Sequence, residues 1–329
     1  MKLVTYKPGE AKTTDAPLFG AVRDREVVRF STADGHDTTA LDSIDAYLAG
    51  LPDTFQRASA IVADPAVAGV PLSDVRLLPA VPRPAALLDF GLSPAHLRAS
   101  GRTLLRRSLP APVGRPLGWV LGRAASRSTK IRFYKGNHHS ISGPGDEITW
   151  PDFSAYLDIE PELALVTGSE SQQHYERVRP AGYVIYNDVS ARDVQLEEML
   201  FTGPASSKDF DTGNGIGPYL ITPDELPDPL AIDVRVDFEN RRSWRGSTSA
   251  YSIHPEELLA HVLRRRSLPA GTIIGMGTIP GCCGLDRDEW LEPGENFDIV
   301  FDGMGRLQQR FGVPPVMPQT SWWKRHTAA

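Results

Sequence analysis

Cysteine is the residue type that this sequence most clearly lacks. Its 329 residues include two cysteines, Cys282 and Cys283, which are neighbours in the chain. Adjacent cysteines rarely form a useful cross-link, so we expect no disulfide framework. The usual CxxC and Cys/His spacings of zinc sites are also missing, which argues against a structural zinc site. The sequence therefore favours a reducing, cytoplasmic environment.

Long apolar runs and an excess of positive charge are missing as well. No stretch approaches the roughly 20 consecutive apolar residues of a membrane span, and residues 1–12, MKLVTYKPGEAK, lack the apolar core of a signal peptide. The net charge of −6 argues against whole-surface binding to nucleic acid. A hydrophobic content of 41% and a charged content of 23% are typical of a soluble globular protein. We therefore expect neither a membrane nor a nucleic acid as a partner.

Residues 1–80 are predicted to form a small N-terminal domain. Residues 19–30, FGAVRDREVVRF, fit a hairpin that turns near Asp24 and Arg25, and residues 41–51 fit a short helix. A proline-rich linker follows at residues 79–84. No catalytic constellation is visible in this part of the chain.

The next stretch has no acidic residue. Between Asp89 and Asp146 the chain carries eight arginines and two lysines, interrupted by glycine and proline. One interpretation is a mobile lid over about residues 89–130 that presents arginine to an anionic substrate. The other is a solvated basic loop or a surface that faces a partner. The residues alone do not decide between them.

An acidic strand begins the second half of the chain. Residues 156–162, YLDIEPE, alternate like a β-strand, so Glu160 and Glu162 leave the same face, and Asp158 has the same parity. The apolar run at residues 163–166 indicates that the strand continues into a core. Carboxylates at a core entrance need a partner, and a divalent cation is a suitable one. The alternative is an exposed acidic strand end.

Two further residues are candidates for the same site. Asp188 ends the β-run GYVIYN and is well placed to close a metal site with the two glutamates. Hard oxygen ligands without thiol or imidazole indicate Mg²⁺, Mn²⁺ or Ca²⁺ rather than zinc. Lys208, in the glycine-rich loop GPASSKDFDTGNGIGP, could hold a substrate oxygen, or could simply pair with Asp209 or Asp211. The dipeptide Arg192-Asp193 could likewise be an internal pair.

The last third of the chain combines one helix with short strands. Residues 255–265 fit an amphipathic helix, and the later β-runs alternate with glycine and proline turns. This pattern is typical of a compact β-rich roll or barrel.

Taken together, these blocks resemble the fumarylacetoacetate hydrolase family over about residues 80–312. The resemblance is carried, in this order, by DF-x5-H from Asp89, the ExE of Glu160 and Glu162, YNDVSARDVQ, SKDFDT around Lys208, and AGTIIGMGTIPG followed by LEPGENFDIVFDGMGRL. It implies an α+β, β-rich fold: a mixed β-roll/barrel catalytic domain at residues 81–329 behind the small N-terminal α/β domain. A homodimer is expected from the resemblance alone.

The resemblance also implies roles for particular residues. Metal ligands would be Asp89, Glu160, Glu162 and Asp188, with Lys208 and Thr212 close to an ion that is most simply Mg²⁺. His96 would be the general base, positioned by Asp286, and Lys208 would stabilise an oxyanion. Substrate-binding residues would be Tyr134, Arg192, Gln195 and Thr278.

The implied activity is metal-dependent hydrolysis of a C–C bond in a β-diketone or acylpyruvate-type keto acid. Two departures from the family pattern leave alternatives open: residues 97–108 contain no acid, and Asp286 is one methylene shorter than the expected glutamate. If Asp286 did not reach His96, a decarboxylase, tautomerase, isomerase or dehydratase would be favoured. A catalytically silent binding protein of the same fold is the third possibility.

Overall fold

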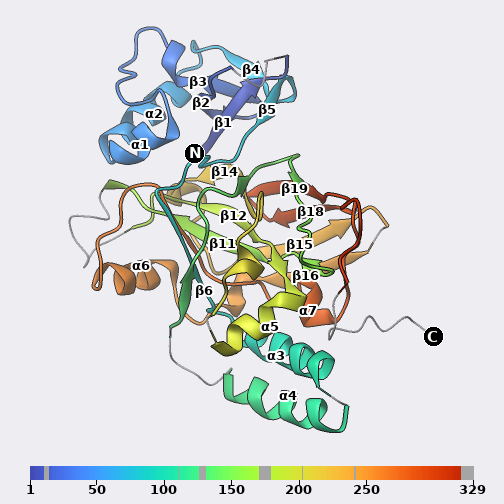
Figure 1. Ribbon diagram of the computed structural model, residues 1–329. Coiled ribbons are helices and arrows are strands. Elements are labelled where there is room, and N and C mark those ends of the chain that lie inside the picture. The colour runs from blue at the N-terminus through green and yellow to red at the C-terminus, as the bar shows by residue number, and fades with distance from the viewer. Residues whose placement is uncertain are drawn as a thin grey trace.

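The computed structural model describes residues 1–10, 15–109, 111–125, 131–169, 179–201, 203–240 and 242–319. Two sheets form the body of the molecule (Figure 1). A small unit with its own two helices lies at one end, and a pair of helices lies at the opposite end. The predicted α+β, sheet-dominated class is confirmed, although the described residues form no closed barrel.

The N-terminal unit contains the predicted hairpin and helix. Its elements are β1 (Lys2–Pro8), β2 (Leu18–Arg23), β3 (Glu26–Arg29), α1 (Ile44–Ala49), α2 (Asp53–Ala63), β4 (Gly69–Pro71) and β5 (Val75–Leu77). Asp24 adopts a positive φ of 56° in the β2–β3 turn, a conformation that Asp tolerates better than most residues. Ser43 caps α1 by accepting a hydrogen bond from the Ala46 N–H at 3.2 Å.

The central sheet joins this unit to the rest of the chain. Twelve strands are hydrogen-bonded into it among the described residues, and its main path runs β4-β3-β2-β1-β14-β12-β11-β17-β6-β7. The further strands are β6 (Ala86–Phe90), β7 (Phe133–Lys135), β8 (Ile141–Ser142), β11 (Pro161–Val166), β12 (Gly182–Asp188), β14 (Asn214–Ile221) and β17 (Thr272–Gly275). Every residue of β11 and β12 is buried, which explains their nearly continuous apolar sequence. The boundary predicted near residue 80 stays a prediction, since β1 pairs with β14.

A second sheet has five strands among the described residues, in the order β16-β15-β18-β19-β9. They are β9 (Glu147–Ile148), β15 (Asp233–Phe238), β16 (Ser243–Ser247), β18 (Asn296–Phe301) and β19 (Gly305–Phe311), and a small pair is formed by β10 (Leu157–Asp158) and β13 (Ser190–Ala191). Burial alternates along β15, β18 and β19, so one face of this sheet enters a core shared with the central sheet.

An amide chain connects the two sheets. The Asn187 side chain on β12 donates to Gln309 Oε1 on β19 at 3.0 Å, and Gln309 donates in turn to Ser142 Oγ at 2.9 Å. At its other end, Asn187 Oδ1 accepts the backbone N–H of Glu160 at 3.1 Å. Each polar group of this buried chain is therefore satisfied between the sheets.

The stretch without acidic residues forms a helical hairpin, α3 (Pro94–Ser108) and α4 (Ala111–Ala125), at the end opposite the N-terminal unit (Figure 1). The prediction of a basic loop is wrong here, and residues 126–130 of the predicted lid lie outside the described residues. Gly114 and Gly118 allow close approach: a Cβ on Gly114 would lie 2.6 Å from the Leu105 carbonyl oxygen. The remaining helices are α5 (Arg192–Phe201), α6 (Pro255–Leu263) and α7 (Gly284–Arg287).

No helix in the part of the chain that the structure describes combines the length and apolarity needed to cross a bilayer.

Candidate metal and catalytic site

Three of the four predicted carboxylate ligands meet where strands of the central sheet lie side by side. Asp89 lies in β6, Glu162 in β11 and Asp188 at the end of β12, and an oxygen of each lies within 4.8 Å of an oxygen of the others. All three are buried, at no more than 7% exposure. The sheet order brings them together although they are far apart in the sequence, because β17 alone separates β6 from β11.

Gly275 on β17 makes this approach possible. A Cβ at this position would lie 2.5 Å from Asp89 Oδ1 and 2.7 Å from Glu162 Oε2, so no larger residue fits without displacing a carboxylate. Glu162 Oε2 also accepts the Gly277 N–H at 2.8 Å. Asp89 Oδ1, by contrast, is buried and has no hydrogen-bond partner among the described residues. An unsatisfied buried oxygen of this kind is costly unless a cation binds it.

Burial raises the pKa of every carboxylate in this group, and a neighbouring carboxylate adds to the effect. Burial, followed by the nearby Asp188, raises the pKa of Asp89 to about 7. Burial, followed by Asp89 and Asp188, raises the pKa of Glu162 well above its usual value, and burial also raises the pKa of Asp188. The donor set is all hard oxygen, which suits Mg²⁺, Mn²⁺ or Ca²⁺. The residues present therefore fit a divalent cation.

Glu160, the fourth predicted ligand, has protein partners instead. It is not part of the three-carboxylate group: its Oε2 contacts Lys208 Nζ, and its Oε1 accepts from Arg192 Nη2 at 2.8 Å. Burial alone would raise the pKa of Glu160, but Arg192 and Lys208 outweigh it and hold that pKa well below its usual range. Lys208 Nζ also contacts Asp188 Oδ2, so Lys208 links Glu160 to the carboxylate group.

Arg192 and Gln195, predicted to bind substrate, are held by the protein. Arg192 is fully buried, and its Nε and Nη2 donate to Asp158 Oδ2 at 2.9 and 2.7 Å. Its Nη1 donates to Gln195 Oε1 at 2.8 Å. The alternative Arg192–Asp193 pair is wrong, because Asp193 accepts from Ser154 Oγ at 2.6 Å and from a backbone N–H. In this structure Arg192 thus orders Asp158 and Glu160.

His96 is reached by Asp286, which was the open question for hydrolysis. His96 Nδ1 lies 2.9 Å from Asp286 Oδ1, and Nε2 lies 3.6 Å from Glu160 Oε1. Burial lowers the pKa of His96, but the Asp286 carboxylate outweighs burial, so the net effect is a raised pKa. Ser93 caps α3 by accepting the His96 N–H at 3.3 Å, which fixes the start of the helix that carries the imidazole.

Two other predicted residues lie outside the carboxylate group. Thr212 Oγ1 accepts from the Thr149 N–H at 2.7 Å and donates to the Asp211 carbonyl at 2.6 Å. Its hydroxyl is therefore hydrogen-bonded to the backbone of the surrounding loops. Thr278 is buried and follows Gly277, whose N–H binds Glu162. The predicted alternative of a surface pair between Lys208 and Asp209 or Asp211 is wrong, because Lys208 is buried against Glu160 and Asp188.

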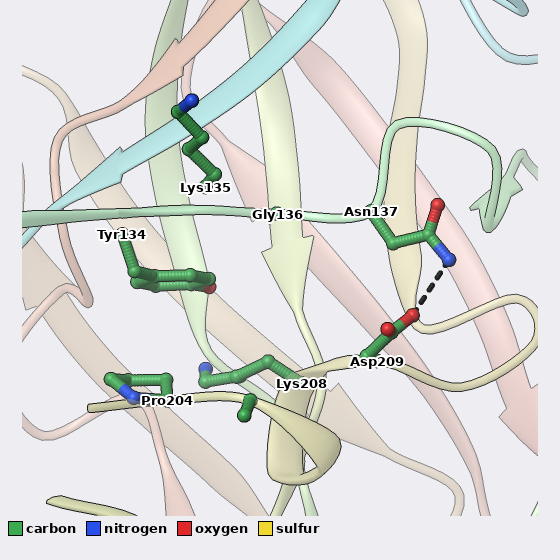
Figure 2. A pocket seen from close by; sticks show the side chains of 8 residues that line it. Tyr134, Lys135, Gly136, Asn137, Pro204, Lys208 and Asp209 are labelled. Atoms are coloured by element: carbon green, nitrogen blue, oxygen red, sulfur yellow. Dashed lines mark hydrogen bonds between the residues drawn. The ribbon is translucent and has the colours of Figure 1, made fainter. Parts of the chain in front are cut away.

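A pocket of about 350 Å³ opens beside Lys208. Figure 2 shows the Lys208 side chain extended beneath the Tyr134 ring, with Nζ 5.9 Å from the ring centroid. The Tyr134 hydroxyl donates to Asp188 Oδ2, and its predicted role in substrate binding stays a prediction. A hydrogen bond of 2.7 Å from Asn137 Nδ2 to Asp209 Oδ1 closes one side of the pocket (Figure 2). Two residues that line the pocket, Tyr134 and Lys208, therefore also contact the Asp188 carboxylate.

Several residues of the site were not predicted. Asp158 accepts the N–H groups of Gly284 and Leu285 at 2.7 and 2.9 Å, and Tyr186 donates to Asp188 Oδ1 at 3.0 Å. The parity of Asp158 with the two glutamates, and of Tyr186 with Asp188, was the available signal. Cys283, whose Sγ lies 3.8 Å from His96 Nδ1, had no signal, because its partner is remote in the sequence.

Comparison with known proteins found curated relatives that match part of this chain. Curated relatives from Burkholderia cenocepacia and Burkholderia ambifaria, named only as hydrolases, are 34% identical over 177 and 176 residues. These matches span 52% of this chain, and 62% and 61% of the relatives' own length. The chain thus covers less than two thirds of those proteins.

Solved structures share the fold over nearly the whole chain. A maleylpyruvate hydrolase from Sphingobium sp. SYK-6, in complex with manganese(II) and pyruvate, is 20% identical with a TM-score of 0.66 and covers 95% of this chain and 99% of its own. A probable 2-hydroxyhepta-2,4-diene-1,7-dioate isomerase from Mycobacterium abscessus is 23% identical with a TM-score of 0.67 and covers 96% and 100%. The family model "Fumarylacetoacetate (FAA) hydrolase C-terminal" matches residues 117–312, more than half of the chain. This chain therefore belongs to the fumarylacetoacetate hydrolase family.

Proposed function

We propose that the protein is a divalent-metal-dependent hydrolase that cleaves a C–C bond in a β-diketone or acylpyruvate-type keto acid. The observation that carries the proposal is the His96–Asp286 contact of 2.9 Å, next to Glu160 and Lys208. A base held by a carboxylate is the arrangement needed to activate water. The family and the hydrolase-named relatives support the same reaction class.

The cation would be held by Asp89, Glu162 and Asp188, with Glu160 behind Lys208. Mg²⁺ is the simplest choice, and Mn²⁺ or Ca²⁺ would also suit these oxygens. When bound, a divalent cation would draw electrons from a chelating dicarbonyl group and so favour departure of an enolate. The fit rests on the unsatisfied Asp89 Oδ1 and on the space that Gly275 leaves open.

The side chains of this chain supply the proton transfers. Asp286 faces Nδ1 of His96, which leaves Nε2 as the nitrogen that removes a proton from water. The water oxygen bonds to the ketone carbon, and Lys208 with the Tyr134 hydroxyl stabilises the negative oxygen that forms. The C–C bond then breaks, its electron pair stays on the departing carbon as an enolate, and that carbon takes up a proton. The products are a carboxylic acid and a methyl ketone or pyruvate-type acid.

A panel of acylpyruvates, oxaloacetate and β-diketones, supplied with Mg²⁺ or Mn²⁺ and with products identified by mass, tests the proposal. We expect His96→Ala to lower turnover by about 10² to 10⁴, the usual contribution of a general base. His261→Ala on α6, which lies outside the site, is the matched control and should retain activity. Hydrolysis at the wild-type rate by His96→Ala would refute the proposal.

A second candidate is a non-hydrolytic isomerase, decarboxylase or dehydratase of a keto acid. It is favoured by the burial of His96, which is 9% exposed, and by a carboxylate–Lys208 group that is complete without the imidazole. This candidate predicts that His96→Ala still exchanges the α-proton of the substrate in D₂O, or still releases CO₂.

A further inference from the structure

A second group of metal-binding side chains lies beside the first. His96 on α3, Cys283 just before α7 and Asp286 on α7 place one ligand atom each within 4.8 Å of the others. None of them belongs to the Asp89, Glu162 and Asp188 group. His96 Nδ1 is the shared neighbour, 2.9 Å from Asp286 Oδ1 and 3.8 Å from Cys283 Sγ.

The chemistry of this second group differs from that of the carboxylates. A thiol, an imidazole and a carboxylate form a donor set for a borderline-soft ion such as Zn²⁺, whereas the first group offers only hard oxygens. Zinc binds such donors at about 2.0–2.3 Å in a tetrahedral arrangement, which places neighbouring donors roughly 3–4 Å apart. The two observed separations from His96 Nδ1 are close to this range. The sequence shows no Cys/His spacing typical of a zinc site here, because His96 is remote from Cys283 and Asp286 in the chain and the tertiary fold brings them together.

Asp286 turns one oxygen toward the imidazole. Asp286 Oδ2 accepts the Gly281 N–H at 3.0 Å, whereas the buried Oδ1 lies 2.9 Å from His96 Nδ1 and accepts no hydrogen bond from elsewhere in the described residues. The Asp286 side chain is 3% exposed. A metal ion at this place would therefore replace the His96–Asp286 contact and keep both side chains as ligands.

The surrounding structure holds the three donors in place. Asp158 accepts the N–H groups of Gly284 and Leu285, which fixes the turn between Cys283 and Asp286. On the other side of the imidazole, His96 Nε2 faces Glu160 Oε1 at 3.6 Å. Metal-bound histidines usually have a carboxylate or carbonyl at their second nitrogen, which orients the ring.

We propose that His96 Nδ1, Cys283 Sγ and Asp286 Oδ1 form a second metal site that takes Zn²⁺ or a similar borderline-soft divalent cation. Binding forms three protein–metal bonds and releases the thiol proton to solvent, with no change of oxidation state. A neutral imidazole moves its proton from Nδ1 to Nε2, and an imidazolium releases one proton to solvent. A fourth position stays open to water or to a ligand.

Occupation of this site has a regulatory consequence that rests on the proposed function. His96 Nδ1 cannot both face Asp286 with a proton and coordinate a metal ion, so Zn²⁺ would remove His96 from its role as base. Hard cations would support turnover at the carboxylates, and Zn²⁺ would inhibit it at the second site.

The alternative is that Cys283 only packs. It contributes to a small buried cluster with Leu104, Tyr156 and Leu285. Cys282 provides the comparison, because it is also a buried free thiol but belongs to the large core, and its Sγ lies 3.0 Å from the place of a Cβ on Gly246. A site at Cys283 must therefore respond to substitution of Cys283 and not of Cys282.

Cobalt titration of the full chain in excess Mg²⁺ tests the site, because thiolate-bound Co²⁺ gives a sulfur-to-metal charge-transfer absorption in the near ultraviolet. We expect this absorption in the wild type and in Cys282→Ser, and its loss in Cys283→Ser. Its absence from the wild type, its persistence in Cys283→Ser, or its loss in Cys282→Ser would overturn the proposal. Circular dichroism verifies that each variant is folded.

A second variant keeps the test decisive if Cys283→Ser does not fold. Asp286→Asn should retain the sulfur absorption but weaken Co²⁺ binding at least about tenfold, and unchanged affinity would contradict the proposal. Glu162→Gln, which removes a ligand of the other group, should leave the absorption intact. Because the absorption measures metal binding and not turnover, it tests the second metal site independently of the proposed hydrolase activity.

Discussion

Glu160 and Glu162 are two residues apart and both buried, but their pKa values are shifted in opposite directions. Arg192 and Lys208 hold the pKa of Glu160 well below its usual range against the effect of burial. Burial, Asp89 and Asp188 instead raise the pKa of Glu162 well above it. The difference lies in the neighbours: protein cations surround Glu160, whereas Glu162 faces other carboxylates.

The comparison separates two ways of keeping an acid buried. Around Glu160 the protein supplies the positive charge itself, and the polar groups are satisfied within the fold. Around Glu162 the described part of the chain places no cation directly, and it leaves Asp89 Oδ1 without a hydrogen-bond partner. The group around Glu162 is therefore neutralised by a cation or a proton from solution, whereas a further cation would be redundant at Glu160.

The largest effect is expected from removing the protein's own cation. Arg192→Met breaks the ion pairs that Arg192 makes with the buried Asp158 and Glu160 and leaves Lys208 alone at Glu160, and breaking a buried ion pair costs about 3–5 kcal/mol. We expect urea unfolding to show a loss of stability of that order.

The control is an exposed pair. Arg76 lies 3.1 Å from Asp146 and is 59% exposed, so Arg76→Met should change the free energy of unfolding by about 0.5 kcal/mol or less. Equal losses in the two variants would show that the Glu160 half of the comparison is wrong.

A smaller effect is expected from blocking the cation at Glu162. Saturating Mg²⁺ or Mn²⁺, at about 100 times its Kd, should stabilise the wild type by about 2.7 kcal/mol. Gly275→Ala should abolish this gain, because its Cβ would lie between Asp89 Oδ1 and Glu162 Oε2. Gly91→Ala, whose Cβ would meet only Leu97 Cδ2 at 3.8 Å, should keep it. Thermal melts with and without metal give the answer, and a full metal response in Gly275→Ala would contradict the assignment.

The smallest effect is a dependence on pH. The folded pKa of Asp89, about 7, lies above the usual value of 3.8, so the folded state holds this proton more tightly than the unfolded state. The resulting stability is present at pH values below about 3.8 and is lost as the pH rises toward 7. Metal-free protein should therefore be less stable at pH 8 than at pH 5, by at most about 2.7 kcal/mol, because the roughly two pH units between 5 and the folded pKa correspond to about 1.4 kcal/mol each.

Asp188→Asn sharpens this measurement. After burial, the Asp188 carboxylate is the largest cause of the raised pKa of Asp89, so without it the loss of stability between pH 5 and pH 8 should shrink. Thermal melts of both proteins in chelator test this, and identical pH profiles would count against a shared proton in the group.

Sequence reasoning located the carboxylates but not their partners. Asp188 at a strand end and Glu162 on a buried strand follow from periodicity and from the apolar run, and both lie in the site. Strand parity placed Glu160 beside Glu162, and it could not show that Arg192 from another element would occupy Glu160. Such pairings depend on long-range packing, which local patterns do not record.

The helical hairpin shows the same limit in the fold. Glycine and proline in residues 90–125 lower helix propensity, and the sequence left a mobile lid and a basic loop or partner-facing surface equally open. In the structure, Gly114 and Gly118 lie where α4 approaches α3, and their missing side chains permit that packing. Tertiary contact between the helices therefore overrides local propensity.

The amide chain through Asn187 and Gln309 makes the acidic strands dependent on a distant part of the polypeptide. Gln309 contributes nothing to the pocket, yet its two amide ends determine which way Asn187 turns, and Asn187 in turn holds the backbone at Glu160. Transplanting β6, β11 and β12 onto another scaffold would therefore not reproduce this constellation. The graft would have to carry β19 with it, or provide a new acceptor for the Asn187 amide.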